Sequence, residues 1–194
     1  YYHLTGSGLF EVGAYQSAQT LTIANFGGPS DSIVFPGANV IFTTPAPILK
    51  FPCTYGQSWT ANHVYYTPFR LTVASFSLNN AQALWVHRLY SPDSFVCWGI
   101  LILPTTTGPS NPVDVLLIKT SRYLVDSYYV NGSPAPAALL SGLNVRQNDS
   151  NYSNTYTFHA AGAELPLFSI YLGEKWDIVG CGYYTNGIYP LATN

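Results

Sequence analysis

The feature that most constrains the fold of this chain is the spacing of its strand-like runs. Runs of β-branched and aromatic residues recur roughly every ten residues, and each is bounded by Gly, Pro or Asn. Helical periodicity is nearly absent. About a dozen short strands without a long helix predict an all-β fold, an antiparallel β-sandwich of a jelly-roll-like kind with at most one short helix.

Turn-forming and strand-breaking residues divide the chain into expected elements. Pro36-Gly37 predicts a turn, Ser91-Pro92-Asp93 predicts the turn of a hairpin, and residues 133–144 are the one candidate helix. We expect strands at Leu9–Tyr15, Gln19–Asn25, Ser32–Phe35, Ala38–Thr43, Ile48–Phe51, Phe69–Phe76, Ala83–Tyr90, Phe95–Leu103, Val113–Thr120, Tyr123–Val130, Thr155–Ala160, Leu167–Leu172 and Ile178–Tyr184. Prolines on both sides of Ile48–Phe51 suit an edge strand. No shift in composition marks a boundary, so we expect one domain over residues 1–194.

The surface of this fold must be unusually poor in charge. Charged residues make up 8% of the chain, whereas a globular domain normally carries about 25%. Tyr, Thr, Ser and Asn replace them, and such a surface repels its neighbours weakly. The net charge of −2 gives no basic footprint for nucleic acid. No apolar run reaches the roughly 18–20 residues that a membrane span needs.

The first residue is Tyr1, and the sequence contains no Met. Cleavage of an export signal, or excision from a longer precursor, explains such a start most simply. We therefore expect an extracellular or cell-surface location.

Several segments carry a resemblance to a known group of proteins. They are residues 48–59 (Ile-Leu-Lys-Phe-Pro-Cys-Thr-Tyr-Gly-Gln-Ser-Trp), 114–119, 126–136, 156–162 and 166–167. Together they cover about half of the chain, and they resemble secreted all-β proteins of Bacteroidetes exported by type IX secretion. The resemblance implies an exported all-β domain and brings no catalytic residues. Precursors of that group end in a separate sorting domain, and nothing after Tyr189-Pro190 looks like one, which fits a mature form.

Modification motifs follow from the same resemblance and from sequons. Bacteroidetes attach O-glycans at Asp-Ser or Asp-Thr followed by a small or aliphatic residue, and Asp31-Ser32-Ile33 matches this pattern at Ser32. Asp93-Ser94-Phe95 is a poorer match. Sequons for N-glycosylation stand at Asn131, Asn148 and Asn151.

Acidic residues and histidines form no convincing catalytic or metal-binding pattern. Glu174 and Asp177 flank Trp176, which could be a sugar site, but a charged hairpin turn is the simpler interpretation. Asp114 and Asp126 have Lys119 and Arg122 as natural partners. The four histidines lack the spacing of a zinc site, and no nucleophile motif occurs, so we expect no enzyme, no cofactor and no metal. These histidines are His3, His63, His87 and His159.

The three cysteines, Cys53, Cys97 and Cys181, all have apolar or aromatic neighbours. They are expected to be buried free thiols; one disulfide with any of three pairings is the alternative, and metal binding is a remote third.

Exposed aromatic side chains are the strongest functional candidates, because they supply contact area and stack on sugars. The first hypothesis is a non-enzymatic structural subunit that self-assembles into a filament, sheath or surface layer. Its subunit contacts would include Tyr1, Tyr2, Tyr189 and Pro190. The alternative is a secreted carbohydrate-binding or adhesion module, in which Trp59 and Trp176, or Trp85 and Trp98, would stack on a glycan.

Overall fold

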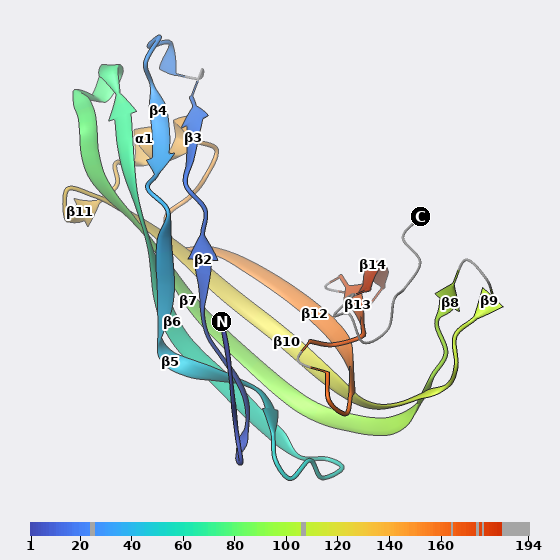
Figure 1. Cartoon of the computed structure of the whole chain (residues 1–194). Helices are drawn as coiled ribbons and strands as arrows, with labels where there is room; N and C mark the ends of the chain where they lie inside the picture. The colour runs from blue at the N-terminus through green and yellow to red at the C-terminus, as the bar shows by residue number, and fades with distance from the viewer. Residues whose placement is uncertain (24–25, 106–107, 164, 174, 176, 184–194) are drawn as a thin grey trace. The chain divides into compact units, whose positions relative to one another are not determined.

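The computed structural model describes residues 1–23, 26–105, 108–163, 165–173, 175 and 177–183. Nearly every element in this part of the chain is a strand (Figure 1). The strands are β1 (Tyr2–Thr5), β2 (Gly8–Gln16), β3 (Gln19–Thr22), β4 (Ser32–Phe35), β5 (Ala38–Lys50), β6 (Ser58–Val73), β7 (Leu78–Leu101), β8 (Pro104–Thr105), β9 (Gly108–Pro109), β10 (Val113–Val130), β11 (Ser133–Pro134), β12 (Asp149–Ala160), β13 (Phe168–Leu172) and β14 (Ile178–Tyr183). The helical elements are the 3-10 turn η2 (Ala74–Phe76) and the helix α1 (Ala137–Gly142).

The expected fold class is confirmed, because the described chain is all-β and α1 is its one α-helix. A three-stranded sheet has the order β1-β2-β5, and a larger sheet has the order β14-β13-β12-β10-β7-β6-β4-β3. The larger sheet therefore largely follows chain order, and β8 with β9 forms a separate small hairpin. Registers given by the paired residues are antiparallel, as between Ser32 of β4 and Thr72 of β6.

The chain divides into two compact units. Unit 1 comprises residues 1–48, 61–90 and 123–151, and unit 2 comprises the remainder. Five strands, β5, β6, β7, β10 and β12, begin in one unit and end in the other.

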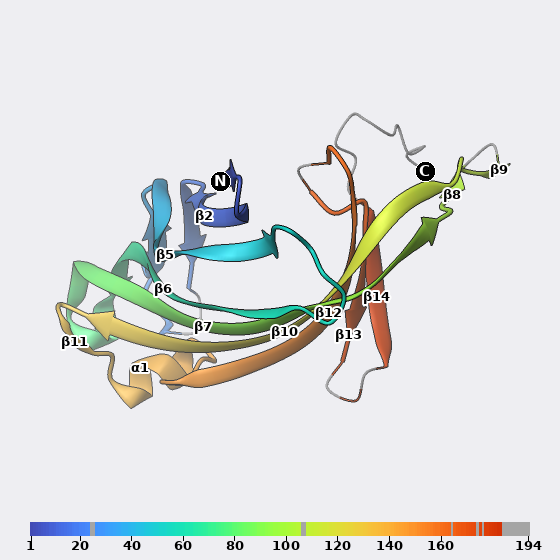
Figure 2. The ribbon, with the colours of Figure 1, turned by 90° about the horizontal axis from the view of Figure 1, so that it is seen from below.

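Unit 1 has two layers, with the three-stranded sheet lying over the larger one (Figure 2). The side chains of β6 alternate strictly: odd-numbered residues are mostly buried and even-numbered ones mostly exposed. We call the odd-numbered side the inner face of unit 1 and the even-numbered side its outer face. Phe69, Leu71 and Val73 form the inner core together with Leu139 of α1.

Unit 2 has its own apolar interior. Deeply buried members come from strands far apart in the sequence, among them Phe95 of β7, Ile118 of β10, and Leu167 and Leu172 around β13. β12 pairs with β13 through the partners Phe158 and Phe168, whose rings are 5.6 Å apart. Both rings are partly buried.

Three expected connections are wrong. Ser91-Pro92-Asp93 is no hairpin turn, because β7 runs through it with Ser91 and Asp93 buried. Residues 113–130 form one strand, β10, rather than two. Residues 38–50 also form one strand, β5, since Pro45 and Pro47 are tolerated at the edge of the three-stranded sheet.

Two smaller expectations are confirmed, and several strands were not foreseen. Gly37 has a φ of 77° between β4 and β5, as the expected turn requires. The short helix lies inside the predicted range 133–144. The strands β1, β8, β9 and β11 and most of β6 were not predicted.

Candidate functional site

A groove of about 820 Å³ lies on the outer face of unit 1. Even-numbered residues of β6 and β7 make up most of its lining, because side chains two apart on a strand share one face, and Phe69 and Ala83 line it as well. From β6 the even-numbered residues are Val64, Tyr66, Pro68 and Arg70, and from β7 they are Gln82, Leu84, Val86 and Arg88. Tyr129 of β10 lines the groove as well.

The groove is positively charged. Arg70 and Arg88 are both exposed, and no acidic residue is among the described residues that line the groove. No ion pair of either guanidinium with a carboxylate is found in the described part of the chain. Two of the seven basic residues of a chain with net charge −2 therefore line one concavity, with no carboxylate partner among the described residues.

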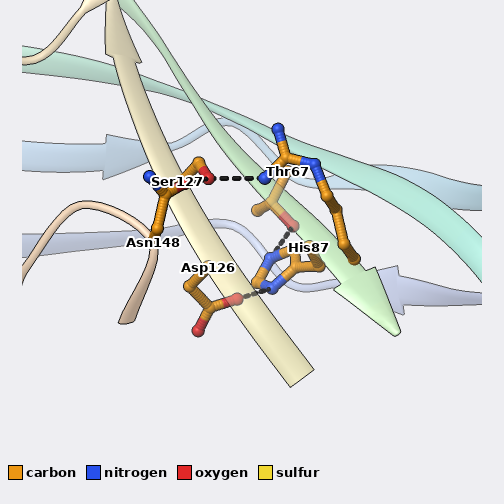
Figure 3. Close-up of polar contacts among 6 residues, drawn as sticks. Thr67, His87, Asp126, Ser127 and Asn148 are labelled. Carbon is orange, nitrogen blue, oxygen red and sulfur yellow. Dashed lines mark hydrogen bonds and ion pairs between the residues drawn. The ribbon is translucent and has the colours of Figure 1, made fainter. Parts of the chain in front are cut away.

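A polar chain fixes one of these arginines. The Arg88 guanidinium donates to Ser127 Oγ at 2.5 Å, and Ser127 Oγ donates to Asn148 Oδ1 at 2.7 Å (Figure 3). Ser127 is fully buried. The contact orients the guanidinium from one side and leaves its other N–H groups available, since Arg carries five donors.

A second network occupies the inner face at the same level of the sheet. His87 Nδ1 lies 2.8 Å from Asp126 Oδ1, and His87 Nε2 lies 3.2 Å from Thr67 Oγ1 (Figure 3). His87 therefore faces inward and contacts Asp126 of β10, while Arg88 faces outward and contacts Ser127 of β10. The two pairs lock β7 to β10 from both sides.

The inner network has the composition of a carboxylate–imidazole–hydroxyl triad, but its surroundings indicate a role in holding strands together. Thr67 and His87 are buried, and the His87 ring is 4.3 Å from both the Tyr65 and Trp85 rings. Burial lowers the pKa of His87 below its usual value, against the opposing effect of Asp126. The neutral ring then donates from Nδ1 to Asp126 and accepts from Thr67, which ties together β6, β7 and β10.

We expect Asp126→Ala to lower the free energy of unfolding by about 2 kcal/mol, because the buried Nδ1–H of His87 loses its charged acceptor. Urea unfolding at neutral pH measures the change. Asp114→Ala is the matched control, since Asp114 is exposed on the same strand, and we expect it to cost at most about 0.5 kcal/mol. Equal losses in the two variants would show that the pair with His87 contributes nothing particular.

Unit 2 carries a surface of a different kind, which we call the apolar strip: Tyr55, Trp98, Ile100 and Ile102. Their side chains are exposed by 71%, 68%, 68% and 53%, respectively. Trp98, Ile100 and Ile102 follow one another at two-residue spacing, and the Tyr55 ring packs edge-on against Trp98 at 6.2 Å. Large contiguous apolar patches of this kind are uncommon on monomeric proteins.

Beside the apolar strip, β7 extends beyond the start of β6, so its backbone on that side could pair with another strand. Phe95 exchanges hydrogen bonds with Gln57 and Gly56, and β6 begins at Ser58. β7 therefore continues past the start of β6, paired with β10 toward the β8–β9 hairpin (Figure 1). Residues 94–113 contain no charged side chain, so the charges that usually discourage pairing of strand edges are absent there.

The residues that the sequence analysis singled out for contact lie apart from these surfaces. Tyr1 and Tyr2 are exposed, as a contact role requires, but the Tyr1 amino group donates to Gly13 O at 2.5 Å and its hydroxyl to Asn39 at 2.7 Å. Tyr189, Pro190 and Trp176 lie outside the described residues. Trp59 is buried, with 5% exposure, so its proposed role as a sugar platform is wrong. Of the three tryptophans among the described residues, Trp98 is the exposed one.

The candidate glycosylation sites differ in accessibility. Asn131, Asn148 and Asn151 are exposed, although Asn148 Oδ1 already accepts from Ser127. Ser32 is partly buried, and its neighbour Asp31 is fully buried with a structural role. Occupancy of these four sites stays a prediction.

The cysteines are free, as expected, but they are not buried as a group. Cys97 and Cys181 are exposed, and Cys53 is partly buried with its thiol donating to Lys50 O at 3.0 Å. Burial raises the pKa of Cys53. Among the described residues, no cluster of His, Cys, Asp or Glu could hold a metal ion. No helix there is long and apolar enough to cross a membrane.

Neither the groove nor the pairing of Asp126 with His87, in place of Lys119 or Arg122, was predicted from the sequence. Alternation along β6 and β7 was the available signal, since it separates Arg70 and Arg88 from the core positions. That β7 and β10 are neighbours was not readable, because His87 and Asp126 are 39 positions apart. Comparison of the chain with protein-family models, with curated proteins and with solved structures found no match.

Proposed function

We propose that this chain is a non-enzymatic structural subunit that self-assembles outside the cell into a filament, sheath or surface layer. The observation that carries the proposal is the apolar strip. In it, Trp98 and Ile100 are each 68% exposed, on the part of β7 that extends beyond the start of β6. When a second copy covers such a surface, the free energy falls by about 25 cal/mol for each Å² of apolar area removed from water.

The occupant of the strip is a second copy of the chain. Strand edges without charged residues pair with one another readily, and the low overall charge makes close approach of like subunits inexpensive. Pairing of one β7 edge with the same edge of another copy would give a closed dimer, while pairing with a different edge would give a polymer. An extracellular location is part of the proposal, supported by the low charge of the chain.

We expect Ile100→Lys to abolish self-association, because a charge at the centre of the apolar strip would have to be buried in the interface. Light scattering after size-exclusion chromatography, with electron microscopy of the same fractions, compares the variant with the wild type. Ile41→Lys is the matched control: Ile41 is 59% exposed on β5, and the same substitution there leaves the strip intact.

The wild type and Ile41→Lys are expected to form the same assemblies, and Ile100→Lys is expected to elute as a 21.2 kDa monomer. Assembly that survives in Ile100→Lys would refute a role for the strip. Circular dichroism verifies that both variants keep the β-fold of the wild type.

A further inference from the structure

We infer that the groove on the outer face of unit 1 binds an acidic oligosaccharide, one whose sugar rings carry carboxylates. This inference concerns a different surface from the apolar strip and goes beyond the proposed assembly. It also gives the carbohydrate-binding hypothesis a site other than Trp59, which is buried.

Charge complementarity is the first argument. Arg70 and Arg88 bring two positive charges into one groove whose described lining holds no acid. Guanidinium groups bind carboxylates with two parallel hydrogen bonds, so an anionic ligand gains both charge neutralisation and orientation. The contact with Ser127 already orders the Arg88 side chain, which reduces the entropy that binding would cost.

The shape and lining of the groove supply the second argument. A volume of about 820 Å³ falls within the range of ligand sites, roughly 300–1,000 Å³. Tyr66, which is 46% exposed, and Tyr129 add aromatic faces, and the Gln82 amide adds a donor and an acceptor for hydroxyl groups. Aromatic rings beside polar and cationic groups match a ligand with apolar ring faces and anionic substituents.

The position of the groove argues against an acidic peptide. Extended peptides are commonly bound by adding a strand to a sheet edge. The groove lies over β6 and β7; β7 has β6 and β10 as neighbours, and β6 pairs with β7 and, at residues 70–72, with β4. Recognition there must use side chains and a ligand's own substituents, which favours a sugar acid over a peptide backbone.

The test is calorimetric titration of the purified chain with tetragalacturonate as the probe. Maltotetraose, a neutral oligosaccharide, and pentaglutamate, an acidic peptide, are titrated in parallel. We expect tetragalacturonate to bind and the other two to bind at least about tenfold more weakly, because each lacks one of the two features that the groove recognises. Pentaglutamate binding as tightly as tetragalacturonate would overturn the assignment to a sugar, and so would the absence of tetragalacturonate binding.

Variants assign the binding to the groove. We expect Arg70→Gln and Arg88→Gln each to weaken tetragalacturonate binding about tenfold or more, as loss of a charged hydrogen bond does. Arg146→Gln is the matched control, since Arg146 is exposed and does not line the groove. Equal weakening in Arg146→Gln would place the binding elsewhere. Ile100→Lys should bind the probe like the wild type, so failure of this inference and failure of the proposed assembly are distinguishable.

Discussion

Asp31→Ala should lower the free energy of unfolding by about 3–5 kcal/mol, the largest loss that we expect from one polar substitution in unit 1. The Asp31 side chain is fully buried. Its carboxylate accepts hydrogen bonds from Gly28 N at 3.1 Å and from Ala74 N at 2.9 Å. It thereby joins the turn between β3 and β4 to η2, the connection between β6 and β7. Alanine would leave both backbone donors without their charged acceptor.

Urea unfolding at neutral pH measures this loss. Asp31→Asn keeps one acceptor oxygen and should fall between the wild type and Asp31→Ala. Ser32→Ala is the matched control, because the neighbouring Ser32 hydroxyl makes one partly exposed contact, with Ser30 O at 3.2 Å. We expect it to cost less than about 1 kcal/mol. A loss of that small size in Asp31→Ala would show that the buried carboxylate is dispensable.

The second large effect concerns Asp93 in unit 2 and depends on pH. Burial raises the pKa of Asp93 to about 7, although Thr120 Oγ1 donates to its carboxylate at 2.5 Å and Arg122 is nearby. A carboxyl group whose pKa is higher in the folded state than in the unfolded state stabilises the fold at low pH. This contribution is fully present below about pH 4 and is lost as the pH rises through about 7.

Each pKa unit corresponds to 1.36 kcal/mol, so ionisation of Asp93 should lower the free energy of unfolding by up to about 4 kcal/mol between pH 4 and pH 8. The Asn side chain of Asp93→Asn cannot ionise, so this variant should not show the decrease. We therefore expect the stability of the variant relative to the wild type to rise by up to about 4 kcal/mol over that range. The change with pH is the readout, because it is independent of any constant cost of the amide group.

His159 produces the opposite slope in the wild type. Burial lowers its pKa to about 4, so its contribution is present above about pH 6.5 and is lost as the pH falls toward 4. The two slopes largely cancel between pH 4 and 6.5 in the wild type, and Asp93→Asn should reveal the His159 slope. Denaturation at a series of pH values measures both, with Asp114→Asn as the exposed control. Parallel pH profiles of wild type and Asp93→Asn would contradict the buried, protonated state of Asp93.

Local patterns in the sequence predicted the fold class and most strand positions because alternation and turn residues act over short distances. They failed where tertiary partners override a local signal. Ser91-Pro92-Asp93 has the composition of a turn. However, Thr120 of β10, a strand far away in the sequence, donates a hydrogen bond to the Asp93 carboxylate, and β7 continues through this segment. Pro68 discourages a strand, but β4 pairs with β6 at residues 70–72, so the missing N–H of Pro68 lies beyond that pairing.

The candidate sites were less predictable than the fold for the same physical reason. Alternation shows that Tyr66 and Arg70 share a face, but only the strand order brings Arg88 and Tyr129 beside them. The apolar strip lies mostly within an apolar run, residues 95–103, whose composition predicts burial. Trp98 and Ile100 are nevertheless exposed, at positions beyond the start of β6. Composition therefore indicated a surface suited to assembly without locating it.

Sedimentation velocity of the wild-type chain over a wide range of concentrations tests whether the chain self-assembles through the apolar strip. We expect the sedimentation coefficient to rise with concentration well beyond that of a 21.2 kDa particle, and Ile100→Lys to remove this rise. A single monomeric boundary for the wild type, unchanged up to the highest concentration, would contradict this self-assembly.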